Sequence, residues 1–254
     1  MRSIDLNCDM GESFGPYTVG ADKEVMPHIT SANIACGWHA GDPMVMDQTV
    51  RLAVENGVNT GAHPGYPDRM GFGRRFIDLP FEELKNGIIY QVSALQGFCV
   101  AHGTKISHVK PHGALYNNAM ADETIARAVA EAVAAVDRSI PVFALAGPQS
   151  QRMAEICRDN GLTVFFEAFP DRLYTPEGKL ASRTMEGAVK SDPEDIAEQA
   201  VMMAKEGTVM DFNGNPIELS AQTLCLHGDT PQAGVLIRSI RSCLEKEGIE
   251  VKSV

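Results

Sequence analysis

A short apolar segment that runs directly into polar side chains and glycine is repeated along this chain, and it restricts the possible folds more than any other feature. In residues 4–12 an apolar segment leads into an amide, two carboxylates and a glycine. Similar segments end before residues 37–42, 61–68, 110–116, 167–172 and 227–229. Short apolar runs bounded by glycine, proline and aspartate are typical of buried β-strands. The pattern therefore predicts strands that carry polar groups at one end.

Amphipathic segments typical of helices alternate with these strands. They span residues 44–55, 80–101, 122–136, 149–160, 194–206 and 232–247. Three of them open with a capping residue and then a proline, at Pro80, Pro193 and Pro231. Several end at a glycine, namely Gly57, Gly103, Gly161, Gly207 and Gly248. Together with an apolar segment at residues 141–146, the alternation predicts seven strands in a parallel sheet.

Two regions interrupt the alternation. Residues 174–190 are polar and show no clear period, so we expect a long loop over the strand ends. Residues 209–212 and 216–219 flank an Asn-Gly turn, which is typical of a β-hairpin. Because no linker or internal repeat is visible, we expect residues 1–254 to form a single domain.

Both an open doubly wound sheet and a closed barrel contain alternating strands and helices. In an open sheet the site lies at one switch point and uses few strands. In this chain polar groups follow at least six strands, as in the ring of loops at one end of a barrel. The sequence therefore favours an α/β fold with a seven-stranded β/α barrel.

Composition excludes some classes of partner. With 254 residues, 44% of them hydrophobic, the chain can bury a large core. A net charge of −11 argues against nucleic acid or an anionic membrane, since both require clustered Lys and Arg. No apolar run approaches the ~20 residues of a membrane span, and we expect a cytoplasmic protein. The six cysteines contain no C-x-x-C pair, so we expect small buried side chains, with a nucleophilic thiol as the alternative.

Four of the seven histidines follow predicted strands directly: His39, His63, His112 and His227. Parallel barrel strands end at one face, so these side chains are expected to share a cavity. The carboxylates that accompany them are Asp9, Glu12, Asp42, Asp68, Glu167, Asp171 and Asp229. Such groups can hold a divalent metal or act directly as acid and base, and no local zinc signature decides between the two. The other histidines, His28, His102 and His108, are expected to be structural.

Cations also occur at the strand ends. Lys110 follows the fourth strand, where an ammonium group can bind an anion, form an ion pair or form a Schiff base. Further candidates to bind a carboxylate or phosphate are Arg74, Arg75, Arg172 and Arg183. Neither a G-x-G-x-x-G fingerprint nor a P-loop motif is present.

Five segments resemble the LamB/YcsF family, and the resemblance extends over nearly the whole chain. They are DLNCDMGE (residues 5–12), ANIACGWHAGD (32–42), GAHPGYPD (61–68), VKPHGALY (109–116) and HGDTP (227–231). Ser13, Trp38 and Pro170 depart from the family pattern, but none of them removes a polar group.

The resemblance implies a distorted seven-stranded β/α barrel, similar to that of glycoside hydrolases and polysaccharide deacetylases. It also implies ATP-dependent ring opening of 5-oxo-L-proline to L-glutamate by a 5-oxoprolinase, in which this chain would be the A component and would assemble with subunits B and C. The complete enzyme would require ATP with Mg²⁺. Because no ATP motif is visible in this chain, we expect the phosphorylation step to belong to these partners.

For this reaction we expect catalytic roles for Asp9, Glu12, His39, His63 and His112. We expect the substrate to contact Asn7, Asn33, Lys110, Arg172, His227 and Asp229. By analogy with deacetylases of this fold, a metal would be held by Asp9, His63 and His112. Two alternatives stay open: a metal-dependent deacetylase or amidohydrolase that acts without ATP, and a non-catalytic component that presents 5-oxoproline to the others.

Overall fold

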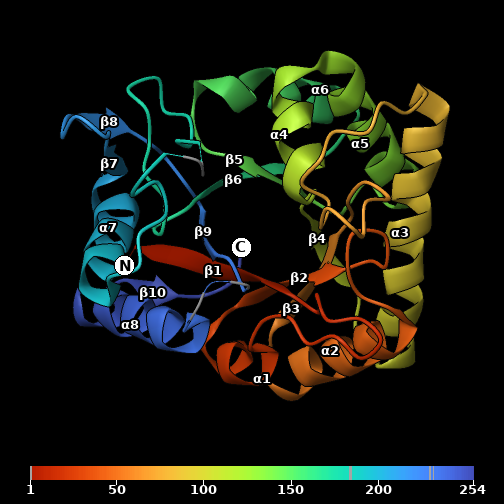
Figure 1. The fold of residues 1–254 in the computed structure, drawn as a ribbon, viewed down its shortest axis with the longest axis horizontal. Helices are drawn as coiled ribbons and strands as arrows, with labels where there is room; N and C mark the ends of the chain where they lie inside the picture. Colours follow the sequence, from red (N-terminus) through yellow and green to blue (C-terminus); the bar gives the residue numbers. More distant parts are fainter. Residues whose placement is uncertain (1, 183–184, 229, 231) are drawn as a thin grey trace.

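Seven parallel strands form a closed ring in the computed structural model, which describes residues 2–182, 185–228, 230 and 232–254. The ring runs in the order β1, β2, β3, β4, β5, β6 and β9, and β9 pairs again with β1 (Figure 1). The strands are β1 (Ser3–Met10), β2 (Ser31–Ala35), β3 (Asn59–His63), β4 (Ile106–Val109), β5 (Val142–Leu145), β6 (Val164–Ala168) and β9 (Thr223–Leu226). The predicted seven-stranded β/α barrel is therefore confirmed. A short strand, β10 (Glu250–Val251), pairs with the beginning of β1.

Helices surround the ring of strands (Figure 1). They are α1 (Asp22–Val25), α2 (Pro43–Glu55), α3 (Phe81–Ala101), α4 (Gly113–Ala121), α5 (Glu123–Val136), α6 (Gln151–Asp159), α7 (Pro193–Glu206) and α8 (Ala233–Lys246). Two short 3₁₀ helices, η1 (Met26–His28) and η2 (Pro148–Ser150), accompany them. Among the described residues, no helix combines the length and the apolar character that a membrane crossing requires.

Most helix boundaries follow from local chemistry that is visible in the sequence. Asp192 caps α7 by accepting hydrogen bonds from the backbone N–H groups of Glu194 and Asp195. The five predicted terminal glycines all adopt positive φ angles, between +67° and +79°. Such angles are strained for residues with a Cβ atom, which explains why glycine ends these helices.

Three local expectations differ from the structure. Pro80 stands at the N-cap position of α3 and no side chain caps that helix, so the predicted cap at this boundary is wrong. Asp42, considered above as a site carboxylate, caps α2 by accepting from the N–H groups of Met44 and Val45. Helix α4 was not predicted, because His112 offers no capping bond and Gly113 occupies its first position. Pro231, predicted to follow the capping residue Thr230, lies outside the described residues, and no side chain caps α8 at its N-cap residue Gln232.

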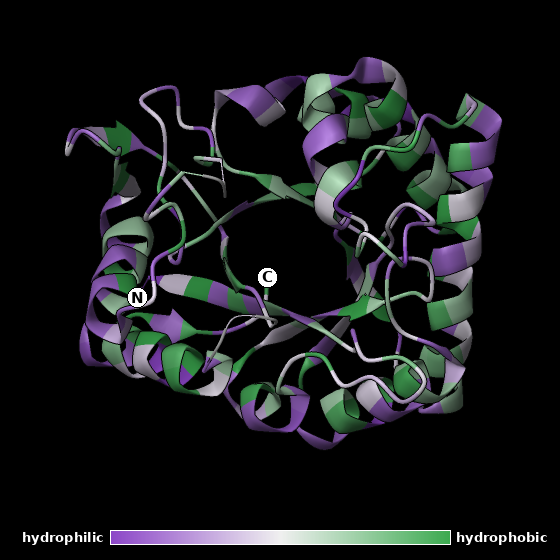
Figure 2. Ribbon diagram, viewed as in Figure 1, coloured by the Kyte–Doolittle hydropathy of each residue, from purple (hydrophilic) through white to green (hydrophobic). Residues whose placement is uncertain are grey.

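Strand β1 shows how the barrel is filled. Its residues alternate between apolar Ile4, Leu6, Cys8 and Met10, which join the hydrophobic core, and polar Asp5, Asn7 and Asp9, which are also buried. Because side chains alternate across a strand, one face packs toward the helices and the other lies inside the ring. The surrounding helices carry both hydrophilic and hydrophobic residues (Figure 2). The barrel interior is therefore unusually polar.

The two irregular regions agree with their predictions. Strands β7 (Thr208–Met210) and β8 (Pro216–Glu218) form an antiparallel hairpin that turns at Asn213 and Gly214. Residues 174–190 contain no helix or extended strand in their described part, only isolated bridges such as Tyr174 to Leu180.

Candidate functional site

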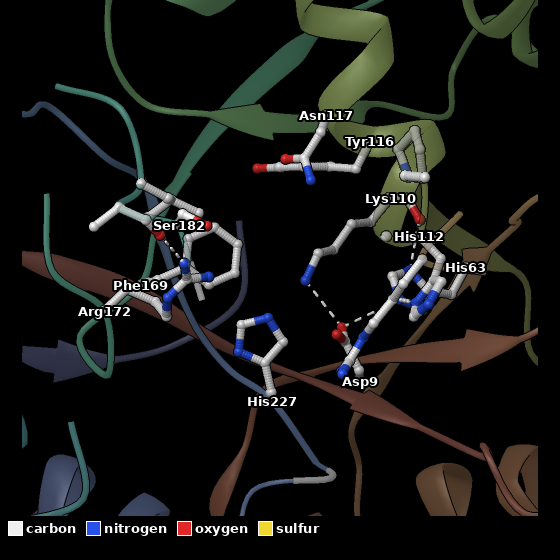
Figure 3. A pocket seen from close by; sticks show the side chains of 16 residues that line it. Asp9, His63, Lys110, His112, Tyr116, Asn117, Phe169, Arg172, Ser182 and His227 are labelled. Carbon is white, nitrogen blue, oxygen red and sulfur yellow. Dashed lines mark hydrogen bonds and ion pairs between the residues drawn. The ribbon is translucent and has the colours of Figure 1, made fainter. Parts of the chain in front are cut away.

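A cavity of about 480 Å³ opens at the carboxyl ends of the barrel strands (Figure 3). Seven of the predicted candidates line it: Asp9, His63, Arg74, Lys110, His112, Arg172 and His227. They come from the ends of several different strands; of the four histidines expected to share this cavity, His63, His112 and His227 line it and His39 does not. Asp229 and Arg183 lie outside the described residues.

Lys110 reaches into this cavity from the end of β4 and is nearly fully buried. Its Nζ lies 2.9 Å from Oδ1 of Asp9, 3.3 Å from Oε2 of Glu167 and 2.9 Å from Sγ of Cys225. Burial alone would lower the pKa of Lys110, but the Asp9 and Glu167 carboxylates raise it well above its usual value. Lys110 is therefore a fixed positive charge shared between two carboxylates.

Asp9 is held as an anion by the same interactions. Burial would raise its pKa, but the Lys110 ammonium and the neighbouring His63 keep that pKa well below its usual range. Burial raises the pKa of the Cys225 thiol well above normal. The thiol therefore stays protonated near neutral pH, which argues against a nucleophilic role for this cysteine.

Asn7 and Asn33 lie below the cavity, inside the barrel. Asn33 Nδ2 donates to Oδ1 of Asp9 at 2.8 Å and to Oδ1 of Asn7 at 2.7 Å. Nε2 of His108 lies 2.7 Å from Oδ1 of Asn33, the side-chain atom that can only accept. Gly61 makes room for this imidazole, since a Cβ atom there would lie 2.0 Å from Nε2 of His108. The two asparagines thus orient Asp9 instead of lining the cavity themselves.

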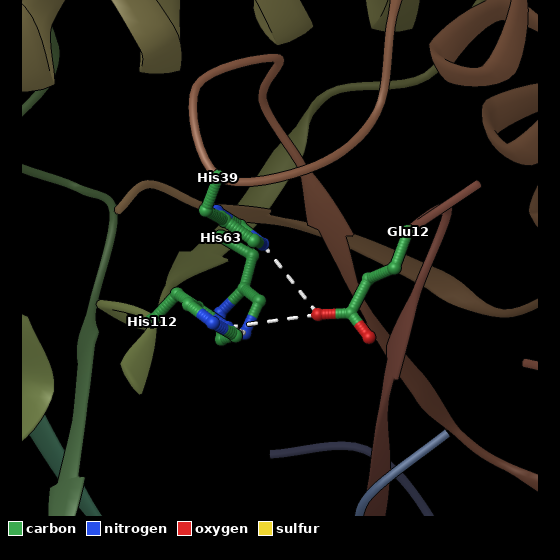
Figure 4. Close-up of side chains that lie close together, drawn as sticks. All are labelled: Glu12, His39, His63 and His112. Atoms are coloured by element: carbon green, nitrogen blue, oxygen red, sulfur yellow. Dashed lines mark hydrogen bonds and ion pairs between the residues drawn. The ribbon is translucent and has the colours of Figure 1, made fainter. Parts of the chain in front are cut away.

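Glu12, His39, His63 and His112 form a second group, called the histidine cluster below (Figure 4). These residues follow or end the successive strands β1, β2, β3 and β4. Oε1 of Glu12 lies 3.5 Å from Nε2 of His39 and 3.6 Å from Nδ1 of His112. Nδ1 of His112 lies 2.9 Å from Nε2 of His63. His63 and His112 touch the cavity, whereas Glu12 and His39 lie behind them.

The backbone orients two of these imidazoles. Nδ1 of His63 lies 2.7 Å from the carbonyl oxygen of Lys110, and Nε2 of His112 lies 2.8 Å from that of Phe72. Because a carbonyl only accepts, each of these ring nitrogens must carry the proton and donate it. Phe72 adopts a left-handed conformation, with φ +54°, at the point where its carbonyl meets His112.

Burial disfavours the charged form of two of these imidazoles, and glycines give the cluster space. Burial and the neighbouring imidazoles lower the pKa of both His39 and His112 well below the usual value. The rings of these two residues stack with centroids 3.7 Å apart. A Cβ atom on Gly65 would lie 2.8 Å from Nδ1 of His39, and one on Gly73 would lie 2.7 Å from Cδ2 of His112.

The opposite wall of the cavity carries a buried cation and a histidine–aspartate pair (Figure 3). Arg172 donates to the carbonyl oxygens of Ala181, at 2.6 Å, and Ala188, at 3.3 Å. Nδ1 of His227 lies 3.2 Å from Oδ2 of Asp171. The His227 ring stacks on Phe169, with ring centroids 5.2 Å apart.

Some candidates lie elsewhere, and some lining residues were not predicted. Arg75 pairs with Asp68 in the loop after β3, whereas Arg74 lines the cavity. Tyr116, Asn117, Phe169 and Ser182 also line it. Tyr116 and Asn117 belong to α4, which the sequence did not predict as a helix, so only their place soon after the fourth strand pointed to them.

The sequence of this chain resembles known proteins over nearly its whole length. Residues 4–254 match the LamB/YcsF family. A protein of Natranaerobius thermophilus, named as the A subunit of 5-oxoprolinase, is 53% identical over 254 residues, covering 100% of this chain and 98% of the relative. A protein of the same name from Thermococcus onnurineus is 54% identical over 248 residues, covering 98% of this chain and 96% of the relative.

Two solved structures share the architecture. The lactam utilization protein of Thermus thermophilus superimposes with a TM-score of 0.94 at 44% identity, covering 99% of this chain and 100% of that chain. The peptidoglycan deacetylase PdaC of Bacillus subtilis superimposes with a TM-score of 0.52 at 11% identity, over 100% of this chain and 88% of that chain. The second likeness concerns the fold alone.

Proposed function

The chain belongs to the LamB/YcsF family, as the sequence resemblance predicted, and on this premise we propose that it acts as the A subunit of a 5-oxoprolinase. The observation that carries the proposal is sequence identity of more than 50%, over nearly the full length, to proteins of that name. The reaction is hydrolysis of the lactam amide of 5-oxo-L-proline to L-glutamate, coupled to ATP hydrolysis. Subunits B and C are the proposed partners and hold the ATP and Mg²⁺.

The cavity offers separate partners for the two polar ends of this substrate. Arg172 is fixed by two backbone carbonyls at one wall, so its guanidinium is oriented before a ligand arrives. Lys110 lies across the cavity from it, next to Asp9 (Figure 3). We assign the substrate carboxylate to Arg172 and the ring oxygen to Lys110, because charge that develops on that oxygen during attack is stabilised by a fixed cation.

Opening the ring requires water to attack the lactam carbon, a base that takes a proton from this water and an acid that protonates the departing nitrogen. Asp9 and His112 are the two candidate bases at the cavity wall, since the structure keeps the first ionised and the second neutral. His227 is the candidate acid, because Asp171 holds its Nδ1 and leaves the rest of the ring beside the cavity. Phosphorylation of the ring oxygen with ATP would make the lactam carbon a better electrophile.

The test is ATP-dependent glutamate release from 5-oxoproline, measured with the chain alone and with subunits B and C. We expect turnover only in the complete assembly, and we expect Asp9→Asn to abolish it. The matched control is Asp159→Asn, which changes an exposed residue on α6 and should leave turnover unchanged.

Three results would contradict the proposal. Full activity of the isolated chain with ATP would remove the need for partners. Amide hydrolysis without ATP would favour a metal-dependent amidohydrolase. Full activity of an assembly that contains both Asp9→Asn and His112→Ala would show that this chain binds the substrate without catalysing its hydrolysis.

A further inference from the structure

We propose that the histidine cluster binds one divalent transition-metal ion of the zinc class through Glu12, His39, His63 and His112. All four side chains are buried, and one possible ligand atom from each lies within 4.8 Å of the others. The donor set of three imidazoles and one carboxylate is one that zinc and its neighbours in the first transition row accept. The inference concerns only this binding and does not depend on the proposed reaction.

The spacing of the donor atoms fits one small ion. Donors bound to one tetrahedral zinc ion at about 2.0–2.1 Å lie about 3.3–3.4 Å from one another. In the cluster, Oε1 of Glu12 lies 3.5 Å from Nε2 of His39 and 3.6 Å from Nδ1 of His112. Nδ1 of His112 and Nε2 of His63 are 2.9 Å apart. The full set of four donor atoms is confined only to within 4.8 Å, so binding requires side-chain rotations that draw the donors together and tilt the His39 and His112 rings out of their parallel stack.

The orientation of two rings points their lone pairs at each other. His63 and His112 each donate their other N–H to a backbone carbonyl, of Lys110 and of Phe72 respectively. With one proton on each ring, at the nitrogen that faces the carbonyl, Nε2 of His63 and Nδ1 of His112 present lone pairs to each other across 2.9 Å. Two facing lone pairs repel, and either a metal ion or a further proton between them removes the repulsion; the metal titration below separates the two. Histidine ligands of metals commonly donate their second N–H to a carbonyl in this way.

The surroundings of His39 favour a bound metal independently of the distances between the donor atoms. Its side chain is fully buried, and neither ring nitrogen has a hydrogen-bond partner among the described residues. Leaving a buried polar nitrogen without a partner is costly, and a bond from Nε2 to a metal would remove much of that cost. The ring faces the other members of the cluster (Figure 4).

Asp9, which fold analogy suggested as a ligand, lies beside this site. Its Oδ1 already accepts hydrogen bonds from Lys110 at 2.9 Å and from Asn33 at 2.8 Å. The same atom lies 3.5 Å from Nε2 of His63. We therefore infer that Asp9 neighbours the metal site without belonging to it. With Nδ1 of His112 bound to the metal, Asp9 remains as the base of the proposed reaction.

The experiment measures metal binding and needs no substrate. The whole chain is treated with a chelator and titrated with Zn²⁺ and with Co²⁺ by calorimetry, and its metal content is measured by mass spectrometry. We expect one ion per chain. His39→Ala should weaken binding by more than about 100-fold, and Glu12→Gln by about 10–100-fold or more. Asp9→Asn should weaken binding by about 10-fold, the lower end of the range for a group beside a metal site, and by less than His39→Ala does.

His102→Ala is the matched control, because His102 pairs with Asp47 on the outside of the barrel. Circular dichroism identifies any variant that does not fold. Should His39→Ala fail to fold, Glu12→Gln keeps the inference testable because it preserves the size of the side chain. Absence of binding to the unmodified chain would overturn the inference, and so would loss of binding in Asp9→Asn with retention in His39→Ala or Glu12→Gln.

Discussion

Nζ of Lys110 lies 2.9 Å from Oδ1 of Asp9, at a point where both side chains are almost completely buried. Lys110→Met removes this charge and leaves the Asp9 and Glu167 carboxylates buried together. Loss of one partner of a buried ion pair typically costs about 3–5 kcal/mol, because the remaining charge stays desolvated. We expect a loss of this order in the free energy of unfolding, measured with denaturant.

A double variant isolates the interaction between Asp9 and Lys110 from the other contacts of each residue. Asp9→Asn combined with Lys110→Met should cost clearly less than the sum of the two single changes, because it removes both buried charges. Lys252→Met serves as a control, since the Lys252–Glu250 pair is exposed and worth little. Strictly additive effects of the two changes would contradict a direct interaction between Asp9 and Lys110.

Removal of the His112 imidazole should slow catalysis. In the assembled enzyme we expect His112→Ala to lower turnover by roughly 10²–10⁴, the size expected when proton transfer is impaired, because the imidazole holds the histidine cluster in place beside Asp9, the base of the proposed reaction. Steady-state kinetics on the complex measure this, with His102→Ala as the control for loss of a histidine outside the cavity. Unchanged turnover would exclude His112 from the reaction.

His108 should make stability depend on pH. Burial, with Lys110 and His63 nearby, lowers its pKa from 6.5 to about 3. Between these two pH values the unfolded chain binds more protons than the folded chain, so the free energy of unfolding falls as the pH falls below about 6.5. This one group contributes a slope of at most about 1.4 kcal/mol per pH unit.

The variant His108→Gln removes this titration while keeping an amide that can bond to Asn33. Denaturant unfolding at several pH values between about 4 and 7 should therefore show a shallower slope for the variant than for the unmodified protein. His102→Gln, at the end of α3, is the control and should keep the original slope. Equal slopes for His108→Gln and the unmodified protein would show that His108 is not buried in its neutral form.

Two glycine substitutions of the same kind should have opposite effects. Gly65→Ala places a Cβ atom 2.8 Å from Nδ1 of His39, so the cluster must shift, and we expect lower stability together with weaker metal binding. Gly97→Ala meets nothing within 4 Å on the exposed side of α3 and should stabilise the helix by about 0.5–1 kcal/mol. Thermal unfolding and the zinc titration measure both effects. A Gly65→Ala protein that binds zinc as well as the Gly97→Ala protein would argue against close packing around His39.

Local rules predicted the barrel because they act over a few residues. Gly57 and Gly207 end helices through their own backbone geometry, and Asp192 caps α7 by accepting from the N–H groups of Glu194 and Asp195, two and three residues ahead. The capping rule also applies to Asp42, at the start of α2. This residue stands directly before Pro43 and an amphipathic helix, a pattern that indicates a helix cap. The pattern therefore outweighs the position of Asp42 after a strand, which had suggested a site carboxylate.

The arrangement within the mouth depends on closure of the barrel, which no local pattern describes. Lys110 and Glu167 lie far apart in sequence, and only the ring of strands brings their charges to within 3.3 Å. For the same reason, the sequence indicated which histidines converge but not that His39 and Glu12 lie behind His63 and His112. Candidate residues at the strand ends could be chosen from the sequence, whereas the partners of their side chains could not.

The hydrogen-bonded interior of the barrel affects how stability varies with temperature. Asp5, Asn7, Asn33, His108 and Thr223 occupy space that apolar side chains fill in many barrels. Unfolding exposes this polar surface, and each Å² of it lowers the heat capacity change by about 0.26 cal/mol/K, whereas apolar surface raises it by about 0.45 cal/mol/K. The curve of stability against temperature should therefore be flatter than for a barrel of equal size with an apolar interior, so that a given enthalpy of unfolding protects the fold over a wider range of temperature.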